Sequence, residues 1–300
     1  MKNKPIYVEI PIQSDTETIW KFTQTPDLHE KWDLRFSSIS YLPKDEVKQQ
    51  QKFSYKTRIG FGLQIKGWGR SSGSSNTKDG SKVSSLQFGS DQTVSIIKEG
   101  GGYWKYIPQQ DSTLFLTKYN YKTRFGYLGK LFDFFIFRPL MGWATAISFA
   151  VLKRWIEEGE MPTTQYLRFF SSWLFTLLFS FIWLYHGLAS KLIHQHPVEL
   201  SMVQTALSIN VKQASVLIMI TGAIEVMFGL MWLFYENRRW LYIIQIAIFP
   251  LLGIIASLTT PDQLFHPFNP VTFNLALLVV SIVGLHTTKN IPTARSCKRK

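Results

Sequence analysis

The sequence is poor in the residues that support redox and metal chemistry. Its single cysteine, Cys297, excludes intrachain disulfides, thiolate metal clusters and a CxxC redox pair. The first 160 residues contain one histidine, His29, in a short helix or loop where we expect it to be exposed. The motifs HExxH and CxxCH, a Walker loop and a dinucleotide fingerprint are all missing. No cofactor and no catalytic residue are therefore evident.

Charged residues are also scarce in one half of the chain. Residues 1–160 contain 23 Lys+Arg and 16 Asp+Glu, the density of a soluble domain, whereas residues 161–300 contain only 10 and 4. Gly159-Glu160-Met161-Pro162 lies at this change of composition and is a natural linker. We therefore predict a soluble domain over residues 1–160 and a membrane domain over residues 161–300.

The net charge of +13 does not indicate a nucleic-acid partner. The first half has no basic run interleaved with aromatic residues, and much of the other basic charge lies in predicted loops and in the tail, residues 295–300. We expect no nucleic-acid binding.

Alternating apolar and polar residues predict a curved antiparallel sheet in the first half. Residues 6–12 form the first strand. The capping box Ser14-Asp15-Thr16-Glu17 starts a helix near Asp15, and Thr25-Pro26 opens a second short helix that ends at Trp32. The remaining strands are expected at residues 53–59, 63–66, 82–89, 92–98, 103–108 and 112–124, with a turn at 100–102.

A long apolar helix over residues 129–158 should close this sheet. Pro139 lies inside it and should kink it near Phe137-Arg138. The same stretch is long enough to span a bilayer, but Asp133 and Arg138 within it favour packing on the sheet. A fifth membrane span is the alternative.

The order of strand, two short helices, six strands and long helix resembles the START/polyketide-cyclase superfamily. The segments that carry the resemblance are residues 6–10, Thr25-Pro26, His29-Glu30-Lys31-Trp32-Asp33 and the terminal helix, over about residues 3–158. The resemblance implies an α+β helix-grip fold with a cavity between sheet and helix for a hydrophobic or amphipathic molecule. A minority of the superfamily catalyses reactions.

Four apolar stretches predict an all-α bundle of transmembrane helices in the second half, at about residues 168–190, 214–234, 239–258 and 271–287. Lysine and arginine flank them mainly on one side, which places both termini in the cytoplasm of an integral, multi-pass protein of the cell membrane. The expected interfacial anchors are Trp173, Trp232, Trp240 and Tyr242.

Polar residues within and beside these stretches are candidate ligand-binding or proton-linked residues. Glu225 lies near the middle of the second stretch, where a charge costs about 2.5–3.5 kcal/mol on insertion scales. It is either a proton-linked or ligand-binding carboxylate, or a neutral carboxyl bonded to a neighbouring helix, with Gly222 and Gly229 allowing close approach. The other candidates, on the predicted outer side, are His186, Lys191 and His266, with His194 and His196 as weak metal ligands.

The second half also resembles the DoxX-like family, over about residues 165–290. The matching segments are Trp183-Leu184-Tyr185-His186-Gly187 with Lys191 and Glu199, Gly222-x-x-Glu225 with Gly229, Pro250, and His266-Pro267-Phe268-Asn269-Pro270 with Asn274. The resemblance implies a four-helix membrane bundle and adds Asn274 to the candidate residues. The family takes its name from a small subunit of a quinone-reducing membrane complex, so quinone is the cofactor to test.

Three functions follow as hypotheses. The first is a binding module, in which the cytosolic cavity holds a lipid or another apolar small molecule and the bundle anchors it in membrane lipid. The second is an accessory subunit of a quinone-linked membrane oxidoreductase that uses Glu225 and His186, with a partner subunit carrying the electrons. The third is an oligomeric proton-linked transporter or a structural chaperone, with Glu225 as the proton site.

Overall fold

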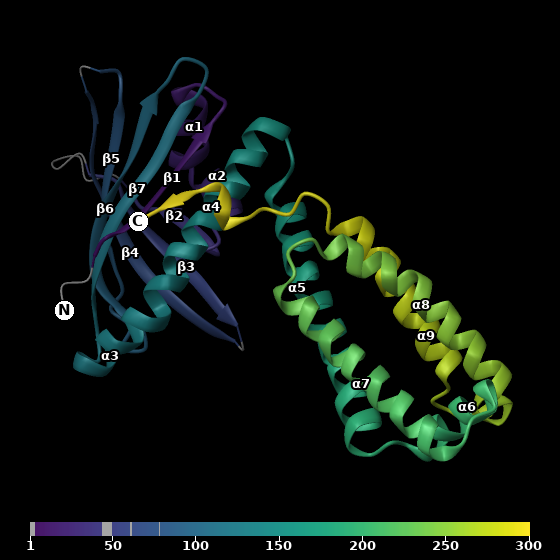
Figure 1. The fold of residues 1–300 in the computed structure, drawn as a ribbon. Helices are drawn as coiled ribbons and strands as arrows, with labels where there is room; N and C mark the ends of the chain where they lie inside the picture. Colours follow the sequence, from purple (N-terminus) through teal and green to yellow (C-terminus); the bar gives the residue numbers. More distant parts are fainter. Residues whose placement is uncertain (1–3, 44–49, 61, 78) are drawn as a thin grey trace. The chain divides into compact units, whose positions relative to one another are not determined.

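A computed structural model describes residues 4–43, 50–60, 62–77 and 79–300. The chain divides into two compact units (Figure 1). The amino-terminal unit contains Met1–Tyr166 together with Pro292–Lys300, and the helical unit contains Leu167–Ile291. Both ends of the chain therefore belong to the same unit.

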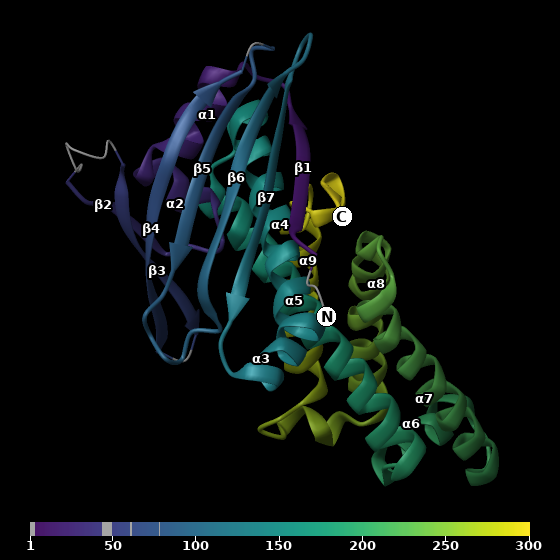
Figure 2. The same cartoon turned by 90° about the vertical axis from the view of Figure 1, so that its left-hand side faces the viewer.

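The amino-terminal unit is built on one antiparallel sheet, as the sequence predicts (Figure 2). Its strands lie in the order β2-β3-β4-β5-β6-β7-β1-β8. They are β1 (Ile6–Ile12), β2 (Ser38–Tyr41), β3 (Lys52–Gly60), β4 (Leu63–Asn76), β5 (Lys82–Gly89), β6 (Ile97–Pro108), β7 (Thr113–Thr123) and β8 (Lys298–Arg299). The alternation did not predict β2, β8 or most of β4.

The glycines at 100–102 do not form a turn, so the prediction of two strands over 92–98 and 103–108 was wrong. β6 runs through them as one strand. A Cβ atom on Gly100 would lie 2.7 Å from Cζ of Phe88, and one on Gly102 would lie 2.4 Å from Cβ of Tyr119. Gly100 thus leaves room for the Phe88 ring, and Gly102 for the close approach of Tyr119 on β7, which is one reason for glycine inside a sheet.

Two short helices follow β1, as predicted: α1 (Thr16–Gln24) and α2 (Pro26–Trp32). The cap of α1 is Asp15 rather than Ser14, because an Asp15 carboxylate oxygen accepts from the Thr18 amide at 2.8 Å. α2 begins at Pro26 with Thr25 as its cap residue. It ends with the Trp32 side chain fully buried.

The long helix consists of three continuous segments: α3 (Gly126–Phe132), the π-helical η1 (Asp133–Phe137) and α4 (Arg138–Glu158). The π turn lies directly before Pro139, where the kink was predicted, and π turns commonly mark such irregularities. Asp133 forms an ion pair with Arg138 at 3.0 Å and accepts a hydrogen bond from Tyr121 at 2.6 Å. α4 packs along β1 and buries its central residues against the sheet (Figures 1 and 2). The sheet-packing prediction for this helix is confirmed within this unit.

The end of the chain covers the free edge of β1. β8 pairs with β1 through Val8 opposite Arg299 and Glu9 opposite Lys298, and Lys298 forms an ion pair with Glu9 at 3.0 Å. Cys297 is buried, with its Sγ 3.3 Å from the Ala146 carbonyl oxygen on α4. An edge strand presents unpaired backbone groups, so the tail satisfies groups that would otherwise be open to another chain.

The helical unit is all-α. Its helices are α5 (Pro162–Tyr185), η2 (His186–Ile193), which continues α5, α6 (Pro197–Leu207), α7 (Val211–Phe234), α8 (Arg238–Thr259), η3 (Pro261–Phe265) and α9 (Pro270–Thr287). The short η4 (Ala294–Ser296) lies in the tail, which belongs to the amino-terminal unit. Within the described residues, five helical stretches are long and apolar enough to cross a membrane. Four belong mainly to this unit, Pro162–Ile193, Val211–Phe234, Arg238–Thr259 and Pro270–Thr287, and the fifth is Gly126–Glu158. In the most apolar part of each of these four stretches, only 17–33% is buried, whereas 50% is buried in Gly126–Glu158. Most of their apolar side chains therefore face outward, as lipid contact requires.

The core of the helical unit contains a polar centre. Gln245 on α8 is fully buried, and its Oε1 accepts from the indole N–H of Trp183 at 2.9 Å and of Trp232 at 2.8 Å. Its Nε2 donates to Ser281 on α9 at 2.9 Å. Because Trp232 and Tyr242 are fully buried in this core, their prediction as interfacial anchors was wrong. They were misassigned because periodicity in an apolar helix does not show which face meets other helices.

Candidate functional site

The amino-terminal unit contains a cavity of about 390 Å³ between the sheet and α4. This volume lies within the range of small-molecule sites. Most of its wall is apolar or aromatic: Leu34, Phe36, Phe53, Tyr55, Ile65, Leu86, Phe88, Ile97, Trp104, Tyr119, Phe137, Met141 and Trp143. The helix-grip prediction of a cavity in this place is therefore confirmed.

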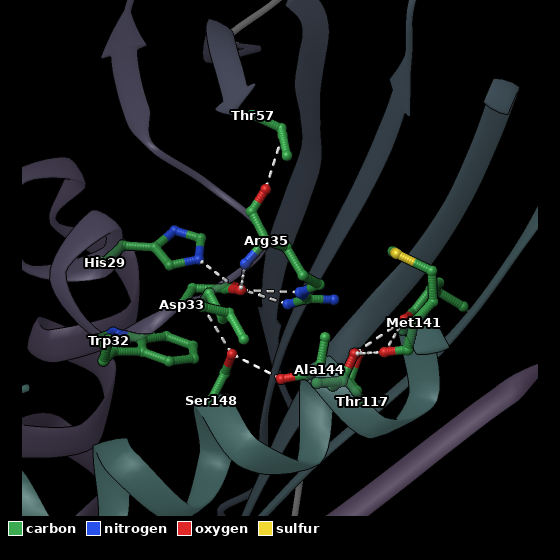
Figure 3. Close-up of polar contacts among 12 residues, drawn as sticks. His29, Trp32, Asp33, Arg35, Thr57, Thr117, Met141, Ala144 and Ser148 are labelled. Carbon is green, nitrogen blue, oxygen red and sulfur yellow. Dashed lines mark hydrogen bonds and ion pairs between the residues drawn. The ribbon is translucent and has the colours of Figure 1, made fainter. Parts of the chain in front are cut away.

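Two charged side chains, Arg35 and Arg58, line this mostly apolar wall. Arg58 is exposed, whereas the Arg35 side chain is only 11% exposed and lies in the interior (Figure 3). Arg35 follows α2 in a turn, and its Nε and Nη2 donate to the two carboxylate oxygens of Asp33 at 2.8 and 2.6 Å. Its carbonyl oxygen accepts from Thr57 on β3 at 2.7 Å. The guanidinium carbon lies 5.6 Å from the ring centroids of Phe36 and Tyr119. The guanidinium is therefore held by the Asp33 carboxylate and by Tyr119, whose side chain also interacts with it.

His29 belongs to the same cluster, and the expectation that it is exposed was wrong. Its side chain is only 12% exposed, lines the cavity, and places Nε2 3.0 Å from Asp33. The ring stacks on Trp32 at 4.9 Å and meets the edge of Trp104 at 5.0 Å. Because a carboxylate accepts hydrogen bonds, Nε2 carries the proton in the neutral ring and Nδ1 is left as an acceptor.

α4 supports the cluster from the other wall. Ser148 accepts from the Leu34 amide at 2.9 Å and donates to the Ala144 carbonyl at 2.8 Å, which fixes the turn that contains Arg35 (Figure 3). Thr145 on the same helix lies 2.9 Å from the hydroxyl of Tyr119. The helix therefore positions both the arginine and the tyrosine.

The charges in this cluster stabilise one another. Burial alone would raise the pKa of the fully buried Asp33, but the Arg35 guanidinium and the His29 hydrogen bond outweigh it and hold that pKa well below its usual value. Burial would lower the pKa of Arg35, and the Asp33 carboxylate instead raises it. Burial raises the pKa of Tyr55 to about 12 and also raises that of Tyr119. At neutral pH the cavity thus presents an ion pair and neutral hydroxyls.

In the helical unit, the structure brings together Lys191 and Glu225, two of the residues singled out from the sequence. Lys191 Nζ lies 3.1 Å from Glu225 on α7 and 3.2 Å from Glu199 on α6. A Cβ atom on Gly222 would lie 2.8 Å from Cβ of Lys191, so this glycine lets η2 and α7 approach closely. Glu225 thus pairs with Lys191 rather than standing alone.

Of the remaining candidates, His186 lies within the range of charge interactions with Lys191 and Glu199. His186 begins η2 and its ring lies 5.8 Å from that of Phe273. Asn274 donates to the Pro270 carbonyl at 2.8 Å and lines a second, apolar cavity of about 360 Å³ beside Pro250. His266 is exposed in the segment before α9.

The two weak metal candidates have structural positions. His196 caps α6 by accepting from the Val198 amide at 3.3 Å, and His194 follows the end of η2. Over the part of the chain that the structure describes, no three His, Cys, Asp or Glu side chains are grouped to hold a metal ion.

Sequence patterns alone did not indicate the residues that form the polar part of the cavity and its support. No role was predicted for Arg35, Tyr119 or Ser148, and Asp33 was noted only within the segment His29-Glu30-Lys31-Trp32-Asp33. The available signal was Trp32-Asp33-Leu34-Arg35-Phe36, in which two opposite charges lie two residues apart among apolar side chains. Such charges are rarely buried unless paired.

Two sequence similarities relate this chain to known proteins. Residues 180–282 match the DoxX-like family. The whole chain aligns with the uncharacterized membrane protein YndG of Bacillus subtilis (strain 168), with 38% identity over 303 residues, 100% of this chain and 99% of the relative.

Several solved structures resemble the amino-terminal unit. The Zhui aromatase/cyclase from Streptomyces sp. R1128 shares 9% identity with a TM-score of 0.37, covering 53% of this chain and 98% of the other. A STAR-related lipid transfer protein from Xanthomonas axonopodis shares 11% identity with a TM-score of 0.34, covering 41% and 73%. With scores this low, the helix-grip assignment depends on the element order and sheet topology above. The chain is thus a multi-pass membrane protein with a helix-grip unit and a DoxX-like unit, and it belongs to the same family as YndG.

Proposed function

We propose that the amino-terminal unit binds a small apolar molecule with one polar group, and that the helical unit holds this binding module at the membrane. The observation that carries the proposal is the placement of Arg35, whose side chain is only 11% exposed, in the wall of a largely apolar cavity of about 390 Å³. Two of its nitrogens are engaged by Asp33, and the third points away from that carboxylate (Figure 3).

The electrostatics of this site favour a neutral or weakly charged polar group. The Arg35 charge is already balanced by Asp33, so a ligand carboxylate would gain less here than at an unpaired arginine. A carbonyl or hydroxyl oxygen would accept from the guanidinium without disturbing the pair. The fit of the rest of the molecule would come from the aromatic wall.

The test is ligand recovery from the full chain. The protein is purified in detergent, and bound molecules are extracted and identified by mass spectrometry. Ala144→Phe places a ring in the cavity and should abolish recovery, whereas Gly142→Ala, on the same helix, should retain it, because a Cβ at 142 would meet only Ile6 at 3.9 Å. Equal recovery from both variants would contradict the proposal.

A second candidate function, proton-linked transport or contact with quinone, is supported by the Lys191 cluster. With one lysine facing Glu199 and Glu225, one carboxylate charge is left unbalanced within a membrane helix bundle. Glu225→Gln should abolish proton flux in liposomes, or quinone-dependent activity of a membrane complex. If this variant keeps both and folds normally, the cluster is a structural link between helices.

A further inference from the structure

Exposed apolar side chains gather at one end of the sheet. β3, β5 and β7 run in the same direction, because each is separated from the next by one antiparallel strand. Their carboxyl ends therefore lie at the same end of the sheet, together with α3, which follows β7 (Figure 2).

The cavity opens at this end. Ile59 at the end of β3, Val94 after β5 and Leu140 at the start of α4 all line it. The same residues are 63%, 67% and 51% exposed. Side chains that are both in the wall and on the surface mark where a cavity reaches the outside.

The surface beside this opening is unusually apolar. We call it the mouth patch; it comprises Ile59, Leu63, Val94, Phe125, Tyr127, Leu128, Phe132, Phe134, Phe135, Ile136 and Leu140, each more than two-fifths exposed. Soluble surfaces rarely expose so many large apolar side chains together, and where they do, a partner covers them.

The η1 segment in this patch has the opposite arrangement to a helix that faces water. Its charged residue, Asp133, is fully buried and bound by Tyr121 and Arg138, whereas Phe134 and Phe135 point outward and are 44% and 68% exposed. A water-facing helix buries its phenylalanines and exposes its carboxylate. The environment that fits this arrangement is apolar.

The loop that carries Val94 is held in place. The Arg124 guanidinium donates to four carbonyl oxygens of this loop and its end: Ser90 at 2.5 Å, Gln92 at 2.9 Å, and Ser95 and Ile97 at 3.2 Å. These hydrogen bonds therefore fix the outward position of Val94.

We infer that the mouth patch docks into the surface of a lipid bilayer, so that the cavity opens into the membrane; the route for a ligand rests on the proposed binding function. Exposed basic side chains at this end, Arg58, Lys66 and Lys130, have no acidic partner among the described residues, and they suit anionic headgroups. The chain is also anchored in a bilayer by its own helical unit, which follows α4 after residues 159–161. These features favour lipid over a second copy of the chain.

The test measures depth in the membrane with the full chain. Cys297→Ser provides a cysteine-free background, into which Leu128→Cys or Phe135→Cys is introduced and labelled with the polarity-sensitive dye NBD. Asp111→Cys, in the exposed turn between β6 and β7 at the opposite end of the sheet, is the matched control. Each protein is reconstituted in nanodiscs of phosphatidylcholine and phosphatidylglycerol, with and without doxyl-labelled lipid.

Dyes at 128 and 135 should show blue-shifted emission and lose most of their fluorescence to the doxyl lipid, while the dye at 111 should not. Equal quenching at all three positions, or at none, would overturn the inference. Cross-linking of two copies through position 128 without quenching would overturn it in favour of a second copy. Lipid extraction on the same samples keeps the two proposals separate, because quenching without a recovered ligand removes only the binding function.

Discussion

Arg35 and Asp33 form a bidentate ion pair in the wall of the amino-terminal cavity, with the Asp33 side chain fully buried and the Arg35 side chain 11% exposed. Only one residue separates them, so the turn after α2 brings them together without help from distant parts of the chain. The distant contribution comes from α4, where Ser148 fixes that turn. The polar end of the cavity therefore depends on both local geometry and the closing helix.

Removing one member of this pair should be costly. Arg35→Met leaves a buried carboxylate without its main partner, and we expect a loss of about 3–5 kcal/mol in the unfolding free energy of this unit. The double variant Arg35→Met/Asp33→Asn removes both charges and should lose clearly less. Hydrogen exchange of peptides from β6 and β7 measures the unfolding free energy of the unit. A double variant as unstable as the single one would show that the loss of stability does not come from the unpaired carboxylate.

The same pair predicts a dependence of stability on acid. The folded pKa of Asp33 lies below the unfolded value of about 3.9, so its contribution is complete above that pH and is lost as the pH falls towards the folded pKa. Asp33→Asn should therefore show a shallower loss of thermal stability than the wild type when the pH falls below about 4. Asp111→Asn, at an exposed turn, should keep the wild-type slope.

Gly102 should not tolerate a side chain, although its neighbour should. Gly102→Ala places a Cβ atom 2.4 Å from Cβ of Tyr119, and such overpacking costs about 1–3 kcal/mol. In Gly101→Ala the nearest atom is the Leu86 carbonyl oxygen at 3.4 Å, an ordinary contact. A lower melting temperature for the first variant alone is expected. Equal melting temperatures would mean that Tyr119 moves away at little cost.

Gln245 should be the most sensitive polar residue of the helical unit. Gln245→Leu leaves the indole N–H groups of Trp183 and Trp232 without their acceptor, and hydrogen bonds between membrane helices contribute about 0.6 kcal/mol each on average. We expect a lower melting temperature in detergent and a shift in tryptophan emission. Ser257→Ala on the same helix removes only a bond to its own Gly253 carbonyl and should change neither.

Local patterns predicted much of the fold because local chemistry decided it. Alternation located β1, β3, β5 and β7, and Thr25-Pro26 located the start of α2. Pro139 located the irregularity in the long helix. These features depend on residues close together in the chain, where propensity and capping act directly.

The errors fall where distant residues intervene. A run of three glycines is typical of a turn. Only the close approach of the Phe88 ring to Gly100, and of Tyr119 to Gly102, explains a continuous strand. Tryptophan is a residue typical of interfacial anchors, so the sequence placed Trp232 there. Only its burial in the core, where it donates to Gln245 on another helix, shows that it has a different role.

The sequence by itself determined the antiparallel sheet closed by a long helix and the apolar stretches that suit a bilayer, because both follow from the spacing of apolar and charged residues along the chain. Only the tertiary structure decided that His29 and Arg35 line one cavity with Asp33 buried between them as their partner, that Lys191 meets Glu225, and that the tail pairs with β1. Burial and ion pairing depend on which surfaces meet in three dimensions, and no spacing along one chain specifies that.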